Sequence, residues 1–358
     1  MPFLRNAWYV AAWDYEVQGE ALFTRRILDE EILLTRGGDS VVHAIRNRCP
    51  HRFAPLSLGK RTGDVIQCAY HGLQFGLDGR CVHNPHGDGV IPDRAAAHSY
   101  PLVLKQTLLW IWMGDAALAD PASIPTLDGL DPQRYAINKG YMHTPVHYEL
   151  MTDNIMDLGH IEFLHAGLLG SEAVRRAHVQ VYQEGSVVHS NRLTHDEILP
   201  PALEALYEAG GKPVDRWLDV TWYPPSLMQL VVGVAPAGAP ERVGKATPGV
   251  HLMTPETENS THYFWSNARD FRKDDAVLHE QLDQGLRYAF EHQDKPMIMA
   301  QARAMEGESF WDLKPIVLAG DAGGMRARIV LRKLIKDEQA HRSVSKAGAA
   351  VAGDGGAS

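Results

Sequence analysis

Cys49-Pro50-His51, followed after 16 residues by Cys68-Ala69-Tyr70-His71, is the stretch of sequence that decides the fold. Each half supplies one thiol and one imidazole from a short segment that follows a β-rich run. Two neighbouring loops of a β-domain can therefore converge and present all four side chains to one inorganic centre.

Two kinds of centre use two cysteines and two histidines. A structural zinc holds all four tetrahedrally, usually with paired cysteines in one loop and paired histidines in another. A [2Fe–2S] cluster takes the cysteines on one iron and the histidines on the other, which raises its potential. Both loops here are mixed, so each reaches both irons. The pattern favours a cluster held by Cys49, His51, Cys68 and His71 that accepts electrons from a flavin or ferredoxin, with zinc as the alternative.

A second pattern predicts a mononuclear iron site. His160 and His165 stand five residues apart in the carboxylate-rich segment Asp153–His165. Two histidines and one carboxylate on one face of Fe(II) leave positions open for O₂. On a straight helix the two histidines would point roughly 140° apart. We therefore expect the helix to end or bend between them, with Gly159 and Gly167 as the candidate places.

Carboxylates near these histidines have two predicted roles. Asp157 precedes His160 by about one turn, so it can bond the second ring nitrogen of that ligand or reach another histidine. The third iron ligand must come from elsewhere in the chain. The segment 291–296 offers Asp294, our choice, and Glu291, its rival.

The order of β-rich and helical patterns predicts an α+β chain of two domains. Residues 1–120 form a small antiparallel β-domain, residues 121–342 a sheet wrapped around helices, and residues 343–358 a disordered Ala/Gly/Ser-rich tail. The expected strands are Ile27–Thr35, Ser40–Arg46, Asp64–Cys68, Leu102–Met113, Val179–Asn191, Leu218–Tyr223, Leu227–Ala235, Val250–Thr254 and Thr261–Ala268, and the expected helices are Tyr148–His165, Asp274–Arg303 and Met325–Glu338.

The composition limits the classes of binding partner and the cellular compartment that we expect for the protein. A net charge of -9 argues against nucleic acid, because no basic surplus is available to neutralise phosphates. The first residues do not have the pattern of a signal peptide, and no run of about 18 apolar residues predicts a membrane span. Three cysteines in a long chain suit a reducing cytoplasm better than a disulfide framework.

The chain to about residue 340 resembles the oxygenase components of Rieske non-haem iron oxygenases. It is most similar to the subgroup of vanillate O-demethylase, dicamba O-demethylase and toluenesulfonate methyl-monooxygenase. The matching stretches include Arg5–Ala12, Cys49–Ser57, Tyr70–Leu73, Asp153–His160, Pro213–Trp217, Thr254–Thr257 and Asp321–Gly324.

This resemblance implies a Rieske [2Fe–2S] domain, a helix-grip catalytic domain and a head-to-tail homotrimer. Electrons would pass from His71 of one subunit through Asp157 of its neighbour to the neighbour's His160. Asp294 matches the carboxylate ligand of the subgroup, and Asn154 is a site neighbour that orients the surroundings of the iron. No dinucleotide-binding glycine motif follows a strand, so a separate reductase would supply NAD(P)H-derived electrons.

The chemistry of the subgroup predicts a monooxygenase that removes an alkyl group from a small aromatic compound, with O-demethylation as the leading reaction. The alternatives are N-dealkylation of an anilide and hydroxylation of an aromatic methyl or ring carbon. A pure electron carrier or a zinc-stabilised binding protein is the alternative from another class. The substrate pocket is expected along strands 218–268, where Gln229, Leu230 and His251 are the candidate contacts.

Overall fold

The computed structural model describes the backbone of residues 3–353 and the side chains of residues 3–343. The first part of the chain forms three small antiparallel sheets, in the orders β1-β10-β9, β2-β3-β4 and β5-β6-β7-β8. The expected boundary at residue 120 falls between β10 and β11. The strands are β1 (Trp8–Trp13), β2 (Phe23–Ile27), β3 (Glu30–Arg36), β4 (Val42–Arg46), β5 (Lys60–Thr62), β6 (Val65–Gln67), β7 (Gln74–Gly76), β8 (Cys81–His83), β9 (Leu102–Lys105) and β10 (Leu108–Trp112).

Two segments that were predicted as single strands are hairpins. Ile27–Thr35 is interrupted at Leu28–Asp29, and Leu102–Met113 is interrupted at Gln106–Thr107. All four turn residues have positive φ, between 50° and 66°. Two-residue turns of this kind usually carry Asn or Gly. Because neither residue is present in these turns, no pattern in the sequence indicated them.

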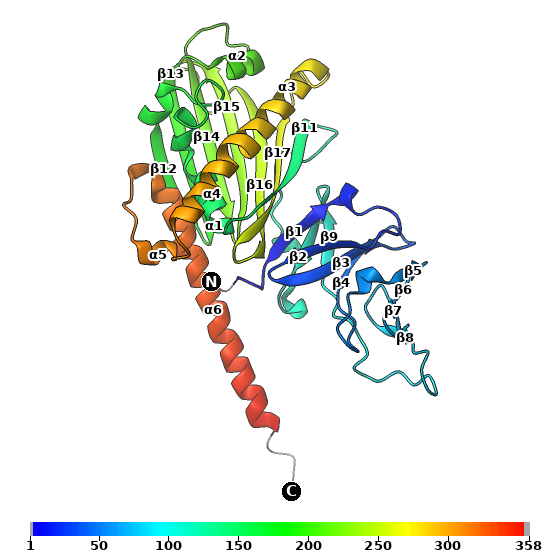
Figure 1. Ribbon diagram of the computed structural model, residues 1–358. Coiled ribbons are helices and arrows are strands. Elements are labelled where there is room, and N and C mark those ends of the chain that lie inside the picture. Colours follow the sequence, from blue (N-terminus) through cyan, green and yellow to red (C-terminus); the bar gives the residue numbers. More distant parts are fainter. Residues whose placement is uncertain (1–2, 354–358) are drawn as a thin grey trace.

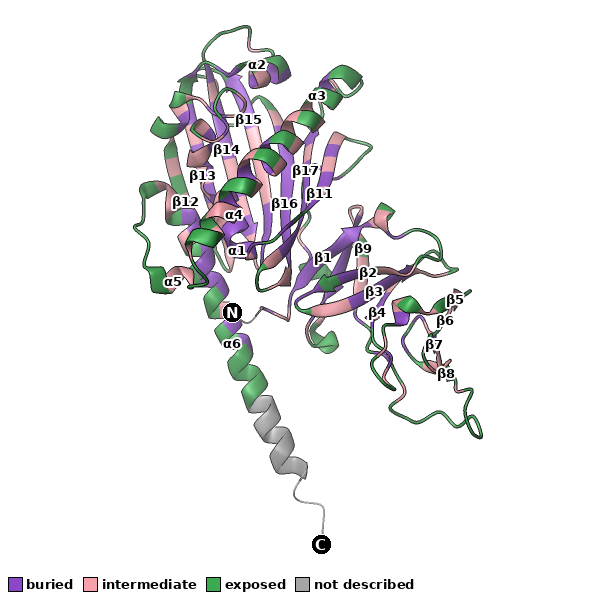
Figure 2. Cartoon of the chain, viewed as in Figure 1, coloured by how far each residue is buried: buried purple, intermediate pink, exposed green. Residues whose placement is uncertain are grey.

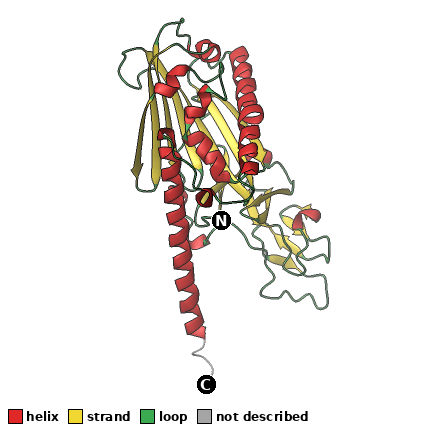
Figure 3. Cartoon of the chain, turned by 60° about the vertical axis from the view of Figure 1, so that its left-hand side comes forward, coloured by secondary structure: helices red, strands yellow, loops and turns green. Residues whose placement is uncertain are grey.

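The second part of the chain wraps one seven-stranded antiparallel sheet around helices (Figures 1 and 3). Its strand order is β11-β17-β16-β15-β14-β13-β12. Val179–Asn191 was predicted as one strand but is two, β12 and β13, and the sequence pattern did not indicate β11 or α2. The elements are β11 (Ala136–Thr144), α1 (Tyr148–Met156), β12 (His178–Glu184), β13 (Val187–Glu197), α2 (Pro201–Tyr207), β14 (Val214–Tyr223), β15 (Leu227–Pro236), β16 (Lys245–Thr257), β17 (Ser260–Arg269), α3 (Ala276–Arg287), α4 (Lys295–Ala304), α5 (Phe310–Leu313) and α6 (Ala322–Gly353).

The predicted helix Asp274–Arg303 lies diagonally across the concave face of the sheet, but it is not a uniform α-helix (Figure 1). Helices α3 and α4 are joined by a π-helical segment, η7 (Tyr288–Asp294). Pro296 lies two residues beyond this segment, and proline cannot donate an α-helical hydrogen bond. Wider π turns of this type occur often at functional sites.

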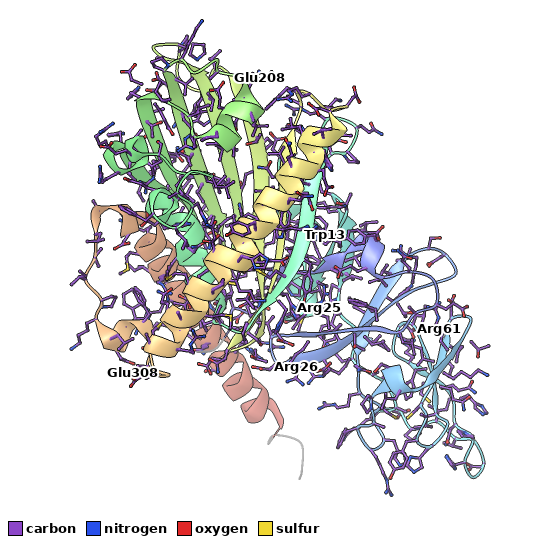
Figure 4. All side chains as sticks on the ribbon, turned by 45° about the horizontal axis from the view of Figure 1, so that its top comes forward. Trp13, Arg25, Arg26, Arg61, Glu208 and Glu308 are labelled. Carbon is purple, nitrogen blue, oxygen red and sulfur yellow. The ribbon has the colours of Figure 1, made fainter. Side chains whose placement is uncertain are left out.

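The two faces of the large sheet have different partners. On the outer face, Leu252 and Phe264 pack with Trp13 and its neighbours from the first domain in one buried cluster. On the concave face, Trp265 contacts Phe290 of η7, with ring centroids 5.3 Å apart. Figure 2 shows the strands largely buried and the helices exposed on their outer side. Figure 4 shows Trp13 at the junction of the domains and Arg61 on the lobe that carries β5–β8.

Helix α6 contains the predicted helix Met325–Glu338 but continues to Gly353. Over residues 343–353 this differs from the expected disordered tail, and residues 354–358 lie outside the described residues. The stretch is rich in alanine, the strongest helix former, and it extends a helix that has already formed. No helix of the described part of the chain is long and apolar enough to cross a membrane.

Candidate metal centres

The two cysteine loops share one backbone design. In each loop the cysteine carbonyl accepts a hydrogen bond from the residue four positions later, at 3.0 Å, and the cysteine N–H donates to the carbonyl five positions later, at 2.8 Å. The residues four positions later, Phe53 and Gly72, have φ of 62° and 74°. A left-handed residue closes each loop tightly, so Cys49 and Cys68 are presented in equivalent ways.

The four predicted cluster ligands gather at the tips of these loops. Cys49 and Cys68 are buried at 1% and 2% exposure. Burial raises the pKa of the Cys49 thiol, and the neighbouring Cys68 thiol raises it further. The rings of His51 and His71 lie outside them, with centroids 4.5 Å apart. Sulfur ligands on the inside and imidazoles on the outside suit a cluster whose histidine-bound iron faces a redox partner.

The spacing of the four ligands separates a cluster from zinc. Four ligand atoms of one tetrahedral zinc lie within about 4 Å of one another. Among the described residues, only one group of three or more His, Cys, Asp and Glu brings its ligand atoms within 4.8 Å, and it contains none of these four residues. Ligands divided between two irons do not need to meet that distance. The loops therefore fit a [2Fe–2S] cluster better than a single zinc ion.

His86 supports the second cysteine loop. Its Nε2 lies 2.7 Å from the carbonyl oxygen of His71, and the two rings are 6.2 Å apart. The sequence signal for this contact was only the proximity of His86 to the motif.

The one compact ligand group in the described part of the chain is His160, His165 and Asp294. Asp294 Oδ1 lies 3.5 Å from His160 Nε2 and 3.2 Å from His165 Nε2. The two imidazole planes are inclined by 74°. Of the two candidate carboxylates, Asp294 joins the histidines and Glu291 does not. This donor set is the one that non-haem Fe(II) uses for O₂ chemistry.

Hydrogen bonds on the second ring nitrogens orient both histidines. Nδ1 of His160 lies 2.8 Å from the backbone carbonyl of Asp157, and Nδ1 of His165 lies 2.8 Å from Oε1 of Gln293. Because both partners are acceptors, Nδ1 carries the proton and Nε2 turns its lone pair toward Asp294. A histidine that binds a metal through Nε2 requires this tautomer. Sequence reasoning missed Gln293, although it is adjacent to Asp294.

The electrostatics of the group favour a bound cation. Burial lowers the pKa of His160, with partial compensation from Asp294, which keeps the imidazole neutral as a metal ligand must be. For His165, burial also lowers the pKa, but the hydrogen bond and charge of Asp294 outweigh it and raise the pKa overall. The negative charge of Asp294 thus favours a cation in the space between the two imidazole rings, and an iron ion would be such a cation.

The local fold around Asp157 differs from the prediction in two respects. The expected helix Tyr148–His165 ends with α1 at Met156, and a short 3-10 turn, η5 (Leu158–Glu162), carries His160. One break therefore precedes both histidines, and a second, at the end of η5, falls between them as expected. The Asp157 carboxylate does not bond His160, because its Oδ1 accepts from the N–H of Gly159 at 2.9 Å and from Arg192 at 2.8 Å. The side chain is 32% exposed.

Asn154 lies beside the metal group, as expected for a site neighbour. Its Nδ2 donates to Asp294 Oδ1 at 3.1 Å and is 3.5 Å from His160 Nε2. The amide therefore fixes the orientation of the carboxylate relative to the two imidazoles.

An apolar cavity of about 120 Å³ opens from these ligands between the sheet and α3. Leu230 and His251 line it, as predicted. Gln229 was also predicted as a substrate contact, but the structure contradicts this. Its side chain exchanges two hydrogen bonds with the backbone of Asp128 on the outer face of the sheet. Strand alternation places adjacent residues on opposite faces, so only one of the pair 229–230 can reach the cavity.

Comparisons with known proteins cover almost the whole chain. Residues 7–101 match the Rieske [2Fe-2S] domain, and residues 144–337 match the vanillate O-demethylase oxygenase C-terminal domain. The oxygenase component of chloroacetanilide N-alkylformylase from Rhizorhabdus wittichii is 43% identical, over 94% of this chain and 97% of that protein. The dicamba O-demethylase oxygenase component from Stenotrophomonas maltophilia is 38% identical, over 95% and 100%. A crystal structure of dicamba monooxygenase bound to 3,6-dichlorosalicylic acid superposes with a TM-score of 0.89 at 37% identity, covering 95% of this chain and all of that one.

Proposed function

Because the chain belongs to the Rieske non-haem iron oxygenases, as an oxygenase component of the branch that contains the vanillate and dicamba O-demethylases, we propose that it oxidatively dealkylates a small aromatic compound. O-demethylation is the leading reaction. The observation that carries the proposal is the placement of His160, His165 and Asp294 at the wall of an apolar cavity. An aromatic substrate bound in this cavity would therefore have its alkyl group close to the three ligands.

The proposed assignment gives each site residue one task. Cys49, Cys68, His51 and His71 would hold the cluster, and His160, His165 and Asp294 would hold mononuclear Fe(II). Iron bound there would activate O₂, so that one oxygen atom enters a substrate C–H bond and the other leaves as water. The apolar wall excludes bulk water, and Asn154 keeps the carboxylate in position. An O-methyl group hydroxylated in this way becomes a hemiacetal, which collapses to formaldehyde and a free hydroxyl group.

Electron supply requires partners. As an oxygenase component, the chain works with a separate reductase or ferredoxin. We also propose a head-to-tail homotrimer. The lobe that carries β5–β8 points away from the catalytic domain of its own chain in Figure 1. A neighbouring subunit could place His71 beside Asp157, which is about one-third exposed, and this is the contact we propose for electron transfer. The three free cysteines suit a reducing cytoplasm.

N-dealkylation of an anilide is the second candidate reaction. Two observations favour it: the similarity to chloroacetanilide N-alkylformylase and the largely apolar lining of the cavity. Hydroxylation of a methyl or ring carbon would use the same ligands but would release no aldehyde.

Aldehyde release during NADH-driven turnover tests the proposal. The enzyme with both centres loaded is combined with a surrogate reductase and offered methoxybenzoates, N-alkyl anilides and methylarenes. Stoichiometric aldehyde from a methyl ether or an N-alkyl compound supports dealkylation and identifies the bond that is cleaved. Oxygen consumption that yields hydroxylated products without aldehyde would overturn it.

A further inference from the structure

The concave face of the sheet presents two polar side chains to the cavity from neighbouring strands. His251 of β16 pairs with Trp265 of β17, and Gly249 pairs with Asn267. Paired residues share one face of a sheet, so His251 and Asn267 both face inward as a diagonal pair, with Cα atoms on the order of 7 Å apart. Both residues line the cavity.

The Asn267 carboxamide is available to a ligand. The described residues include no hydrogen-bond partner for this side chain, and its amide atoms are not among the buried atoms left without a partner. The residue is half-buried although its neighbours Ser266 and Ala268 are buried. Gly249, directly opposite, has no side chain to cover it. The amide therefore opens onto the cavity with one donor and one acceptor group.

The hydrogen bond of His251 turns a donor toward the same space. Nδ1 of His251 lies 2.6 Å from the hydroxyl oxygen of Tyr263. Burial raises the pKa of Tyr263 well above its usual value, so the hydroxyl keeps its proton. That hydroxyl has no other acceptor among the described residues, so it donates to Nδ1. The proton of the neutral imidazole is then on Nε2, and burial, which lowers the pKa of His251 to about 4, keeps the ring neutral.

The charge of the cavity disfavours an anionic substrate. Arg216 lines the cavity, and its Nε and Nη2 have no hydrogen-bond partner among the described residues, but its charge is balanced by Glu197, whose Oε1 lies 3.1 Å from Nη2. The hydroxyl groups of Ser171 and Thr194 donate hydrogen bonds to Glu197, which hold the carboxylate beside the guanidinium. A substrate carboxylate would be desolvated without a free cation to pair with it. A neutral carbonyl group loses much less hydration free energy than a carboxylate when it enters the cavity.

We propose that His251 and Asn267 jointly bind the carbonyl oxygen of a neutral aryl amide, which makes Asn267 a specificity-determining residue of this enzyme. The inference rests on the proposed dealkylase function and assigns its substrate class. His251 Nε2–H and Asn267 Nδ2–H are the two donors. Leu230, in register with Gly249, keeps the adjoining wall apolar for the aromatic ring.

Equilibrium dialysis of the holoenzyme, with both centres loaded and oxidised, tests the inference without turnover. The probes are N-methylacetanilide, its carbonyl-free analogue N-ethyl-N-methylaniline, and 4-methoxybenzoate. One to two hydrogen bonds predict about tenfold tighter binding of the anilide than of the amine. Asn267→Leu should reduce this preference to about threefold or less while leaving the affinity for the amine unchanged. Gln229→Leu, on the outer face of the neighbouring strand, is the matched control and should keep the wild-type preference.

This binding experiment and the aldehyde-release experiment can fail independently of each other. Wild-type binding that favours 4-methoxybenzoate, or an Asn267→Leu variant that weakens the anilide and the amine equally, would overturn the inference even if aldehyde is released from other substrates. An Asn267-dependent preference for the anilide supports the inference even if turnover gives hydroxylation without aldehyde. Asn267→Asp removes the donor without adding bulk, so it should also lose the preference, and retention in that variant would contradict the donor role.

Discussion

Replacing Asp157 by asparagine tests the proposed contact between subunits. The Asp157 carboxylate accepts from the Gly159 N–H and from Arg192, it caps the η5 turn that carries His160, and its side chain is 32% exposed. Asparagine keeps the size of the side chain and an oxygen for Gly159. It removes the negative charge opposite Arg192 and the acceptor that we propose for His71 of the next subunit.

The structure sets the expected magnitudes. A hydrogen bond between charged groups contributes about 1.5–3 kcal/mol when it is buried, and an exposed ion pair contributes about 0–1 kcal/mol. At 32% exposure the Asp157 side chain lies between these cases, so we expect the free energy of unfolding to fall by about 1 kcal/mol. His160 is oriented by the backbone carbonyl of residue 157, which the substitution leaves in place. Both metal centres should therefore load fully, while turnover falls at least about 100-fold.

Three measurements separate electron transfer from assembly: metal content with the visible spectrum, thermal unfolding, and stopped-flow re-oxidation of a chemically reduced cluster in the presence of O₂ and substrate. Re-oxidation should slow as much as turnover does. Asp219→Asn is the control, because Asp219 also pairs with an arginine, Arg242, but on the exposed side of β14. It should lose similar stability without losing turnover. Wild-type re-oxidation in the Asp157→Asn variant would refute the bridge, and loss of mononuclear iron would show that the residue acts on the iron site instead.

Three further substitutions test other parts of the structure. His160→Ala should lose the mononuclear iron and keep the visible spectrum of the cluster, and bleaching would contradict the division into two sites. Gln293→Leu removes the acceptor on His165 Nδ1 and should weaken iron binding about 10- to 100-fold, measured by chelator competition, with the cluster unaffected. His147 caps α1 through a bond from the Glu149 N–H to its Nδ1, and burial beside Arg328 lowers its pKa to about 4. The unfolded state then binds more protons between pH 6.5 and 4, so stability from this group is complete above about 6.5 and is lost as the pH falls through that window. Between pH 7.5 and 5 the loss is about 2 kcal/mol, and His147→Asn, which retains a capping side chain, should reduce the pH dependence of urea unfolding by that amount; an unchanged slope would place the titration elsewhere.

Residue chemistry was predictable where a ligand set restricts the choice of residue types. Cys49, Cys68 and their partner histidines could be recognised because few residues bind iron, and the mixed loops indicated two metal ions. The same restriction identified His160 and His165. Asp294 could not be separated from Glu291 by pattern alone, because an α-helical and a π-helical turn place those two residues differently. The π segment η7 places Phe290 and Asp294 at the cavity and Gln293 against His165.

Conformations that depend on tertiary contacts were not predictable. The turn at Leu28–Asp29 contains neither glycine nor asparagine, and it is held from outside, since the N–H of Leu28 donates to the Pro255 carbonyl and that of Asp29 to the Glu256 carbonyl, both at 2.9 Å. The prediction that Gln229 contacts the substrate was wrong for a related reason. Alternation showed that residues 229 and 230 face opposite sides, but it did not show which side is the cavity.

These same contacts connect the cluster domain to the substrate site. The turn at Leu28–Asp29 holds β16 at its end, the hydroxyl of Thr254 donates to the Val10 carbonyl at 2.7 Å, and His262 Nε2 lies 2.8 Å from the Arg26 carbonyl. Together they fix β16 and β17 from the outer face. A slip of one residue in either strand would turn its inward side chains outward. The packing of the first domain therefore helps to determine which residues face the cavity, so substitutions at this junction should alter substrate preference even though the junction lies behind the sheet.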